Sequence, residues 1–271
     1  MTYFLSDAHL GSRVITDPEA HQQRLVALLD RMAQDAEEIF LLGDMFDFWY
    51  EYFFERHQWI DRQGNWHLPR SKRTFEQFLR TLRSLTDKGI KVHYFIGNHD
   101  IWTFGDLRRN TGVIIHTQPA SLTLQGQKVF LAHGDGLVPS DYMTNLPKDM
   151  QKRIRQFMHL RTFFHHPVPQ FFYRLQPPAL GDAFGYEWAR RSRLKEIQHP
   201  FPYRGDDREE LVLWADEHTE YDLCIFGHRH VNLHLQRSNR PEVVILGDFF
   251  RQFTYAQMTD GQIEMNHFTV H

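Results

Sequence analysis

The stretch Phe40-Leu41-Leu42-Gly43-Asp44-Met45-Phe46-Asp47 joins an apolar run to a glycine and an aspartate. The run from Ile39 to Leu42 has the length and composition of a buried strand, and it ends at Gly43. Asp44 then comes after the carboxyl end of that strand, where open α/β sheets place their binding sites. A single aspartate after an apolar run is most often a turn residue. The functional interpretation of Asp44 therefore depends on other stretches of the same design.

An apolar strand followed by a polar turn occurs four more times in the chain. The four stretches are Tyr3 to His9, Val92 to Asp100, Val129 to Asp135 and Leu223 to His230. Apolar residues at helical spacing predict helices over 21–36, 74–87 and 209–218. Strands that alternate with helices predict an α/β (α+β) fold, in which the strand ends bring carboxylate, amide and imidazole groups together.

Residues 139–204 interrupt this alternation with helix-like segments that are rich in aromatic and basic residues and are separated by prolines. We interpret them as a helical cap inserted into a catalytic domain formed by residues 1–138 and 205–271. The alternative is a helical hairpin that only completes the core. The tail has strand-like runs at 243–248, 253–258 and 262–270, which predict a second, largely antiparallel sheet.

The composition narrows the functional class. A chain of 271 residues fits one large domain with an insertion, and its net charge of −3 argues against generic nucleic-acid binding. The single Cys224 excludes an internal disulfide and favours a reducing compartment. The chain shows no signal-peptide pattern and no apolar run of about 18 to 20 residues, so we expect a cytoplasmic protein. Peripheral attachment to a membrane surface stays open, as does the oligomeric state.

The polar residues after the strands can form two metal half-sites. One would contain Asp7, His9 and His230, the other Asn98, His133 and His228, and Asp44 would bridge them. Carboxylates and imidazoles without a thiolate suit two divalent ions, Mn²⁺ before Fe²⁺ or Zn²⁺, and argue against a structural zinc site. Two ions about 3.5 to 4 Å apart suit in-line displacement at phosphorus.

The chemistry-bearing motifs resemble the five blocks of the calcineurin-like metallophosphoesterases. They are Asp7-x-His9, Gly43-Asp44-x-x-Asp47, Gly97-Asn98-His99-Asp100, His133 and Gly227-His228-x-His230. The resemblance implies a four-layer α/β/β/α sandwich with a dinuclear site between the sheets. It also implies that His99 is the catalytic histidine beside the phosphate and that Asp100 orients it. An imidazole with a pKa near 6.5 can donate a proton to a leaving oxygen, although His99 could instead be a further metal ligand.

The chain as a whole is similar to the UDP-2,3-diacylglucosamine hydrolases of lipid A biosynthesis. The similarity lies in residues 3–10, 39–49, 97–104, 131–137 and 225–231, and it includes the aromatic and basic insertion. It implies hydrolysis of a lipid-linked nucleotide sugar to UMP and 2,3-diacylglucosamine 1-phosphate at the inner face of the inner membrane. Members of that family often carry Arg where this chain has His99.

The cap supplies candidate substrate-binding residues. The cations expected to meet a diphosphate, together with Asn98 and His99, are Arg190, Arg191, Arg193 and Lys195. The aromatic residues expected to bind acyl chains are Phe157, Phe163, Phe164, Phe171 and Phe172. The alternatives are a solvated basic helix face and ordinary core packing.

Three other functions use the same residues. A phosphodiesterase or phosphomonoesterase on a small phosphoester would need the same metals and would make fuller use of His99. A nuclease is disfavoured by the acidic charge balance. A non-catalytic scaffold with a phosphoesterase fold is disfavoured because it has no physical need for seven metal-binding groups and a histidine together.

Overall fold

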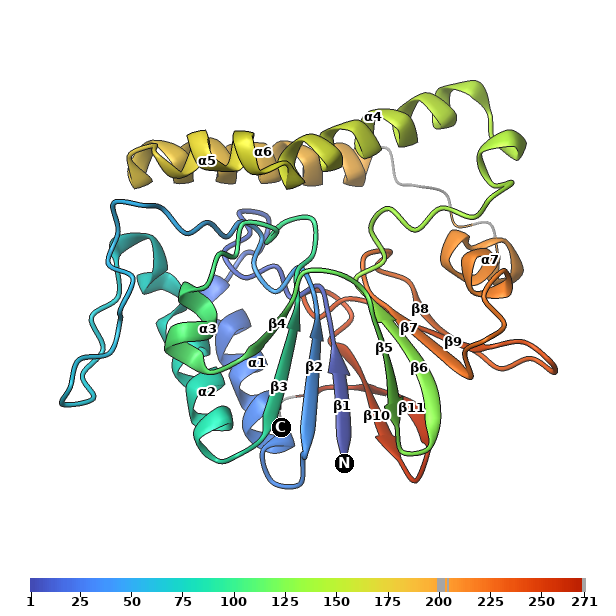
Figure 1. Ribbon diagram of the computed structural model, residues 1–271, viewed down its shortest axis with the longest axis horizontal. Coiled ribbons are helices and arrows are strands. Elements are labelled where there is room, and N and C mark those ends of the chain that lie inside the picture. Colours follow the sequence, from blue (N-terminus) through green and yellow to red (C-terminus); the bar gives the residue numbers. More distant parts are fainter. Residues whose placement is uncertain (199–202, 204, 270–271) are drawn as a thin grey trace.

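The computed structural model describes residues 1–198, 203 and 205–269, without the side chains of residues 195–198. Two sheets form its centre (Figure 1). The first has the order β11-β10-β1-β2-β3-β4. Its strands are β1 (Thr2–Leu5), β2 (Glu38–Leu42), β3 (Lys91–Phe95), β4 (Ile114–His116), β10 (Thr254–Thr259) and β11 (Gln262–His267). Strands β1 to β4 are parallel, so the carboxyl ends of β1, β2 and β3 meet at one edge.

The second sheet has the order β5-β6-β7-β9-β8. Its strands are β5 (Ala120–Leu124), β6 (Gln127–Ala132), β7 (Leu223–Phe226), β8 (Asn232–Leu235) and β9 (Glu242–Leu246). The central strands β6, β7 and β9 are parallel, and the edge strands β5 and β8 are antiparallel to their neighbours. The carboxyl ends of β6 and β7 therefore also lie together.

Alternation along the strands divides the core into layers. Phe4 and Phe40 point into the core between the two sheets, whereas Leu5 and Leu41 pack in the cluster beneath α1 (Pro18–Met32) and α2 (Glu76–Asp87). On the far side, α7 (Glu210–Asp216) covers the second sheet through Leu211 and its neighbours. The short helix α3 (Asp106–Thr111) precedes β4, and the 3₁₀ segments are Arg70–Phe75, Met143–Asn145 and Asp206–Arg208. The predicted four-layer α/β/β/α sandwich is confirmed.

The predicted helices over 21–36, 74–87 and 209–218 correspond to α1, α2 and α7. The prediction for the tail is wrong. Strands β10 and β11 form a hairpin that pairs with β1 in the first sheet, while β9 pairs with β7 in the second. The tail is thus shared between both sheets, because the edge of β1 and the edge of β7 each offer a row of backbone groups to pair with.

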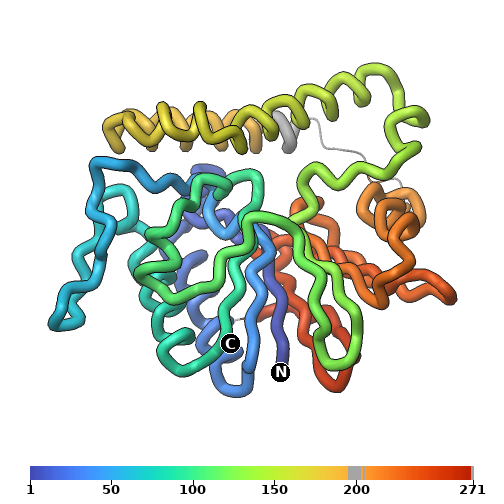
Figure 2. The backbone as a smooth tube through the Cα atoms, viewed as in Figure 1, coloured from blue at the N-terminus to red at the C-terminus, as the bar shows by residue number. Residues whose placement is uncertain are grey.

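Three helices of the predicted cap lie across the carboxyl ends of β1, β2 and β3, as the tube in Figure 2 also shows. They are α4 (Lys148–His165), α5 (Pro167–Arg174) and α6 (Pro178–Gln198). The prolines separate these helices and do not fragment them: Pro167 and Pro178 each open a helix, where a missing N–H costs nothing. The described residues include no helix that is long and apolar enough to span a membrane.

The cap is fastened to the sandwich near both of its ends. At one end, Ile154 and Met150 of α4 pack with Tyr142 in a separate apolar cluster that reaches α7. At the other end, the Tyr50 hydroxyl donates to the Gln170 carbonyl (2.7 Å) and the Tyr52 hydroxyl to the Asp182 carboxylate (2.8 Å). Between these contacts, Nε of Arg161 donates to Oδ2 of Asp135 (2.5 Å) and Nε of Arg193 donates to Oδ1 of Asp47 (2.9 Å).

Candidate metal centre and active site

Five of the seven predicted ligands have a left-handed backbone. Their φ angles are 53° at Asp7, 47° at His9, 53° at Asp44, 68° at His228 and 52° at His230. Only a few per cent of non-glycine residues adopt this conformation, and it costs free energy wherever it occurs. The sharp bends turn the side chains after three strands toward one place between the sheets.

Backbone hydrogen bonds and two glycines hold these bends. The Asp7 amide donates to the Gly43 carbonyl (3.1 Å), and the His9 amide donates to the Asp44 carbonyl (3.0 Å). A Cβ on Gly97 would lie 2.2 Å from Oδ1 of Asp44, and one on Gly227 would lie 2.7 Å from Oδ2 of Asp7. Glycine is therefore required at both positions, because any side chain would displace a carboxylate.

The first predicted half-site is assembled in the structure. Nε2 of His230 lies 3.1 Å from Oδ1 of Asp7 and 3.3 Å from Nε2 of His9. Nε2 of His9 is 3.6 Å from the same Asp7 oxygen. The three donor atoms thus converge, and Asp7 and His9 are fully buried.

The structure brings together two members of the second predicted half-site, His133 and Asn98. Nε2 of His133 lies 3.3 Å from Oδ1 of Asn98 and 3.4 Å from Oδ2 of Asp44. Its Nδ1 is 2.8 Å from the Leu42 carbonyl, which can only accept, so Nδ1 carries the hydrogen. His228 contacts this group through its ring and its backbone. Its ring centroid lies 5.1 Å from that of His133, and its backbone amide donates to Oδ2 of Asp7.

Asp44 lies between the two groups. Besides the contact with His133, its Oδ2 is 3.9 Å from Nε2 of His9, and its Oδ1 accepts from the His99 amide (2.8 Å). Donor atoms of Asp7, Asp44 and His133 lie within 4.8 Å of one another, as do those of Asp7, His9 and His230. The same oxygen, Oδ2, approaches both groups, and the bridging role of Asp44 with one oxygen to each ion stays a prediction.

Two of the four imidazoles among the predicted ligands are held in the neutral form that binds metal. Burial lowers the pKa of His9 and of His228, and the positive Arg193 guanidinium lowers that of His9 further. Both imidazoles are therefore neutral, the form that binds metal. Burial alone would lower the pKa of His133, but the Asp44 carboxylate outweighs it and raises that pKa. In turn, the charge of His133 lowers the pKa of Asp44 despite its burial.

The donor set fits two divalent cations. Buried carboxylates and imidazoles converge in two groups that share Asp7, one with His9 and His230 and the other with Asp44 and His133. The described donors include no cysteine, since Cys224 is buried within β7. Oδ2 of the buried Asp47 beside this cluster has no hydrogen-bond partner among the described residues, and a bound cation would give it a partner.

Residues 2–232 match the family described as calcineurin-like phosphoesterase. The chain belongs to this family. A Porphyromonas gingivalis protein named UDP-2,3-diacylglucosamine hydrolase is 32% identical over 268 residues, which cover 94% of this chain and 92% of the relative. A Neisseria meningitidis protein of the same name is 24% identical, with coverage of 96% and 94%. The phosphoesterase is also similar to a solved dimetal phosphatase from Danio rerio, at 14% identity, a TM-score of 0.47 and coverage of 97% and 94%.

His99 of this phosphoesterase faces the metal centre. Its Nδ1 lies 2.7 Å from the Asp47 carbonyl, so Nδ1 donates there. The ring lies 5.1 Å from that of His9, and a donor atom of His99 is grouped with those of His9 and Asp44. His99 also lines the adjoining cavity, which gives its Nε2 access to a substrate.

The orienting role expected for Asp100 belongs to the Asp47 backbone. The Asp100 carboxylate is fully buried and accepts from Tyr94 (2.6 Å), Gly97 (2.6 Å) and Met45 (3.0 Å). Burial and the nearby Asp44 charge raise its pKa to about 6. Asp100 therefore ties together the loops after β2 and β3 and does not touch the imidazole that it was expected to orient.

The four predicted cap cations have different environments. Arg193 is buried: its Nε donates to Oδ1 of Asp47 (2.9 Å), and its Nη2 lies 2.6 Å from Nδ1 of His9. Arg191 lines the cavity and pairs with Glu187 (2.7 Å), whereas Arg190 pairs with Glu187 from outside the cavity lining. The side chain of Lys195 lies outside the described part of the structure.

A cavity of about 1060 Å³ extends from the metal centre beneath the cap. Of the five phenylalanines expected to bind acyl chains, only Phe157 lines it. Phe164 packs between Trp102 and Trp188, and the other three are more than half exposed on the outside of the cap. The apolar lining comes instead from residues such as Leu160, Phe184 and Trp188.

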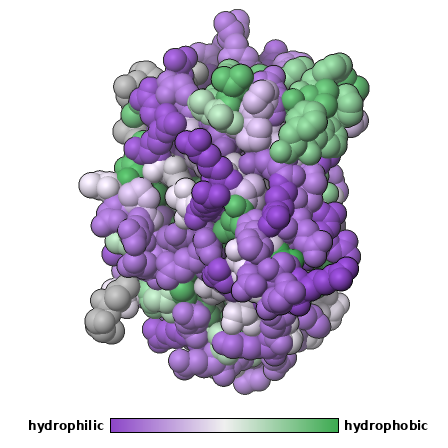
Figure 3. Space-filling model, turned by 90° about the vertical axis from the view of Figure 1, so that its left-hand side faces the viewer, coloured by the Kyte–Doolittle hydropathy of each residue, from purple (hydrophilic) through white to green (hydrophobic). Residues whose placement is uncertain are grey.

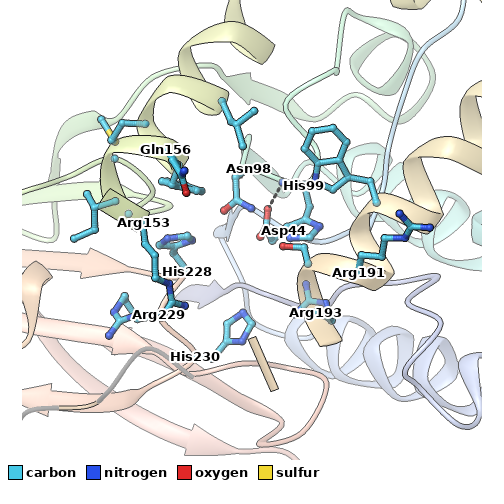
Figure 4. A pocket seen from close by; sticks show the side chains of 18 of the residues that line it. Asp44, Asn98, His99, Arg153, Gln156, Arg191, Arg193, His228, Arg229 and His230 are labelled. Atoms are coloured by element: carbon cyan, nitrogen blue, oxygen red, sulfur yellow. Dashed lines mark hydrogen bonds between the residues drawn. The ribbon is translucent and has the colours of Figure 1, made fainter. Parts of the chain in front are cut away.

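Several polar residues of the lining were missed by the sequence analysis. They are Arg153, Gln156, Glu210 and Arg229, and Figure 4 shows the first two and Arg229 beside His228. Arg229 lies between two predicted ligands in Gly227-His228-Arg229-His230, and this position could have predicted that it lies beside the site. The others lie on helices whose sequence patterns do not show which face meets the cavity.

Proposed function

We propose that this phosphoesterase hydrolyses the pyrophosphate of UDP-2,3-diacylglucosamine to UMP and 2,3-diacylglucosamine 1-phosphate. The observation that carries the proposal is a buried set of metal donors that opens onto a cavity of about 1060 Å³ with apolar residues in its wall. A small phosphoester does not need such a wall, whereas acyl chains gain roughly 0.8 kcal/mol for each CH₂ that they bury. The names of the two bacterial relatives agree with this substrate.

We propose the metal ligands as the sequence placed them. Asp7, His9 and His230 would hold one divalent ion, Asn98, His133 and His228 the other, and Asp44 both. Mn²⁺ is the ion we expect, since carboxylate, amide and imidazole donors suit it. When bound, two such ions neutralise phosphate charge and lower the pKa of a coordinated water.

The chain's own residues then orient the substrate and move protons. His99 is held by the Asp47 carbonyl with its Nε2 toward the cavity, so it can donate a proton to the oxygen that leaves. The Asn98 amide can donate to a phosphate oxygen. Water supplies an oxygen to the uridylyl phosphorus, the bond from that phosphorus to the bridging oxygen breaks, and the lipid phosphate departs. Arg193 is fixed by Asp47 and adds a permanent positive charge at the site.

We further propose that residues 139–204 form a lid that contacts the inner face of the inner membrane. Among the side chains that the structure describes, ten of the twelve exposed large hydrophobic ones belong to this segment. Six that do not line the cavity form an outer cap patch: Phe163, Val168, Phe171, Phe172, Leu175 and Leu180. Figure 3 shows apolar side chains gathered at the cap end of one face. The segment contains 11 Lys and Arg against five Asp and Glu, so its charge of +6 favours an anionic lipid surface, whereas the rest of the chain carries −9.

Product analysis tests the reaction. Purified enzyme with Mn²⁺ and UDP-2,3-diacylglucosamine in detergent should release UMP, and in H₂¹⁸O the label should enter UMP. Label found only in the lipid phosphate would contradict attack at the uridylyl phosphorus. A lack of turnover, with hydrolysis of cyclic nucleotides or simple phosphoesters in the same panel, would favour the phosphodiesterase or phosphomonoesterase alternative.

Vesicle flotation tests the membrane contact. The wild type should float with vesicles of phosphatidylethanolamine and phosphatidylglycerol, and Phe171→Ser/Phe172→Ser should float less. Phe54→Ser is the matched control, because Phe54 is 73% exposed but lies outside the cap. Equal flotation of all three proteins would remove the outer cap patch from the proposal.

A further inference from the structure

Residues 227–230, which we call the His228 turn, supply one predicted ligand to each half-site. His228 belongs to the second half-site and His230 to the first, and both have a left-handed backbone, with φ angles of 68° and 52°. Only Arg229 lies between them, and its amide donates to the Gly227 carbonyl (2.7 Å). Two left-handed residues within four make this conformation costly, so contacts from outside the turn must hold it.

The Arg229 side chain makes such a contact. Its Nε donates to Oε1 of Glu209 (2.5 Å), and its Nη2 donates to Oε2 of the same carboxylate (3.2 Å). Oε1 of Glu210 lies 3.3 Å from the same Nε. The exposed fraction is 11% for the Arg229 side chain and 2% for that of Glu209. A buried bidentate pair fixes both the distance and the plane of the guanidinium, so Glu209 holds the middle of the His228 turn in one place.

Glu209 is anchored by a well-packed element. It is the residue immediately before α7, and the apolar side chains of α7 are buried in the cluster that covers the second sheet. The same helix lies beside the His228 turn: a Cβ on Gly134 would lie 3.1 Å from Cδ1 of Leu211 and 3.5 Å from Cβ of His228. The packing of α7 on the sheet therefore fixes Glu209, and Glu209 in turn fixes the His228 turn.

The other ligand pair with the same spacing is held in a comparable way. Asp7 and His9 also have left-handed backbones, with φ angles of 53° and 47°, and only Ala8 separates them. The Ala8 carbonyl can only accept, so Nε2 of the buried His21 donates to it (2.7 Å). His21 belongs to α1, which packs on the first sheet. In both pairs, a buried polar side chain from an outer helix, or from the residue that precedes one, thus holds the residue between the two ligands.

We propose that Glu209 is a positioning residue of the metal centre. Through Arg229 it holds the His228 turn, so that His228 and His230 point to the two predicted ions before either ion binds. Loss of this carboxylate should therefore weaken the binding of both ions. The inference rests on the proposed function only in taking His228 and His230 as metal ligands, and it does not depend on the substrate.

Glu209→Gln tests the proposal, because it keeps the shape of the side chain and removes its charge and one of its two acceptor oxygens. In the described part of the chain, Glu209 is not among the residues that line the cavity, so the substitution acts on the turn and not on a substrate. The ion-free protein is titrated with Mn²⁺, and the electron paramagnetic resonance signal of free Mn²⁺ is followed. Both dissociation constants should rise about 10- to 100-fold, the usual effect of losing a group that orients a ligand. Glu209→Asp keeps the charge on a shorter side chain and should give an intermediate loss.

Asp216→Asn is the matched control. Asp216 is the last residue of α7 and forms the same kind of pair with Arg237, whose Nη2 donates to Oδ1 (2.5 Å) and whose Nη1 donates to Oδ2 (3.0 Å). Both variants should lower Tm, but Asp216→Asn should bind Mn²⁺ like the wild type. Wild-type affinity in Glu209→Gln, or an equal loss of affinity in Asp216→Asn, would overturn the positioning role. If circular dichroism shows that Glu209→Gln does not fold, wild-type affinity in Glu209→Asp overturns it instead.

His228→Ala and His230→Ala separate this inference from the proposed ligand set. Each should lose one ion in the same titration. If both variants bind two ions as tightly as the wild type, the proposed ligands are wrong. If they lose an ion while Glu209→Gln binds like the wild type, only the positioning role is refuted. Turnover of UDP-2,3-diacylglucosamine is measured separately and bears only on the proposed reaction.

Discussion

The metal centre and the cap meet opposite requirements. At the centre, five residues hold strained left-handed backbones, and buried hydrogen bonds and close-fitting glycines fix every turn. The cap instead leaves large apolar side chains in water, with Phe172 64% exposed, and contacts the sandwich through a few side chains along its length, such as Tyr50 and Asp47. A site for ions must be rigid, because its donors have to converge before the ion arrives. The three cap helices instead enclose a cavity of about 1060 Å³ beside this site.

The largest effect should come from the centre. Asp44→Asn removes the carboxylate that lies between both donor groups, so metal content should fall and hydrolysis should drop to background. Elemental analysis with activity measurement checks this, and circular dichroism should show an intact fold. Two bound ions with normal turnover would show that Asp44 does not bridge.

His99→Gln should separate chemistry from metal binding. The variant should keep both ions and lose about 10²- to 10⁴-fold in kcat, the usual contribution of a positioned proton donor. Loss of one ion instead would identify His99 as a ligand, in line with its place beside His9 and Asp44.

Arg193 joins the two regions, because it is the cap residue that donates to Asp47 at the centre. Arg193→Ala leaves a buried carboxylate without its partner, and we expect the free energy of unfolding of the ion-free protein to fall by about 3 kcal/mol. Denaturant titration measures this. The control is Arg190→Ala on the same helix, whose pair with Glu187 is partly exposed and is worth about 1 kcal/mol or less. Equal losses would mean that Arg193 does not fasten the cap.

Gly185 tests how closely the cap approaches the sandwich. A Cβ there would lie 2.2 Å from the Phe48 ring. Gly185→Ala should therefore cost about 1 to 3 kcal/mol of stability, although alanine normally favours a helix. Ser192→Ala, at an exposed position two turns further along α6, should not destabilise the protein. A stabilised Gly185→Ala would show that this contact is loose.

The smallest effect lies outside both regions. Nδ1 of the partly exposed His57 is 2.7 Å from Oδ2 of Asp106, and this hydrogen bond raises the pKa of His57. A raised pKa in the folded state stabilises the protein below the unfolded value of about 6.5, and this stabilisation is lost as the pH rises through the folded value. His57→Gln should thus destabilise at pH 5.5 more than at pH 8.5. The pH dependence should vanish in an Asp106→Asn background.

The alternation of strands and helices and the polar residues at the strand ends could be predicted from local sequence patterns, whereas the four-layer sandwich was implied by the family resemblance. A run such as Phe40 to Leu42 has the pattern of a buried strand, and the polar residues after that run must lie at the strand end. Because β1, β2 and β3 are parallel, Asp7, Asp44 and Asn98 lie at one edge of the sheet for any conformation of the connecting loops. The order of the five motifs along the chain also indicates that these residues belong to one site.

The residues that face the cavity and the pairing of the tail strands were set by tertiary packing. Phe163 and Phe157 are both aromatic residues on α4, but the rotation of the helix leaves one outside and turns the other to the cavity. Arg190 and Arg193 look alike in sequence, and only one reaches Asp47. Asp100 is the sequence neighbour of His99, yet its carboxylate accepts from a buried tyrosine and two amides. These choices depend on packing between segments far apart in the chain, and no local pattern encodes them.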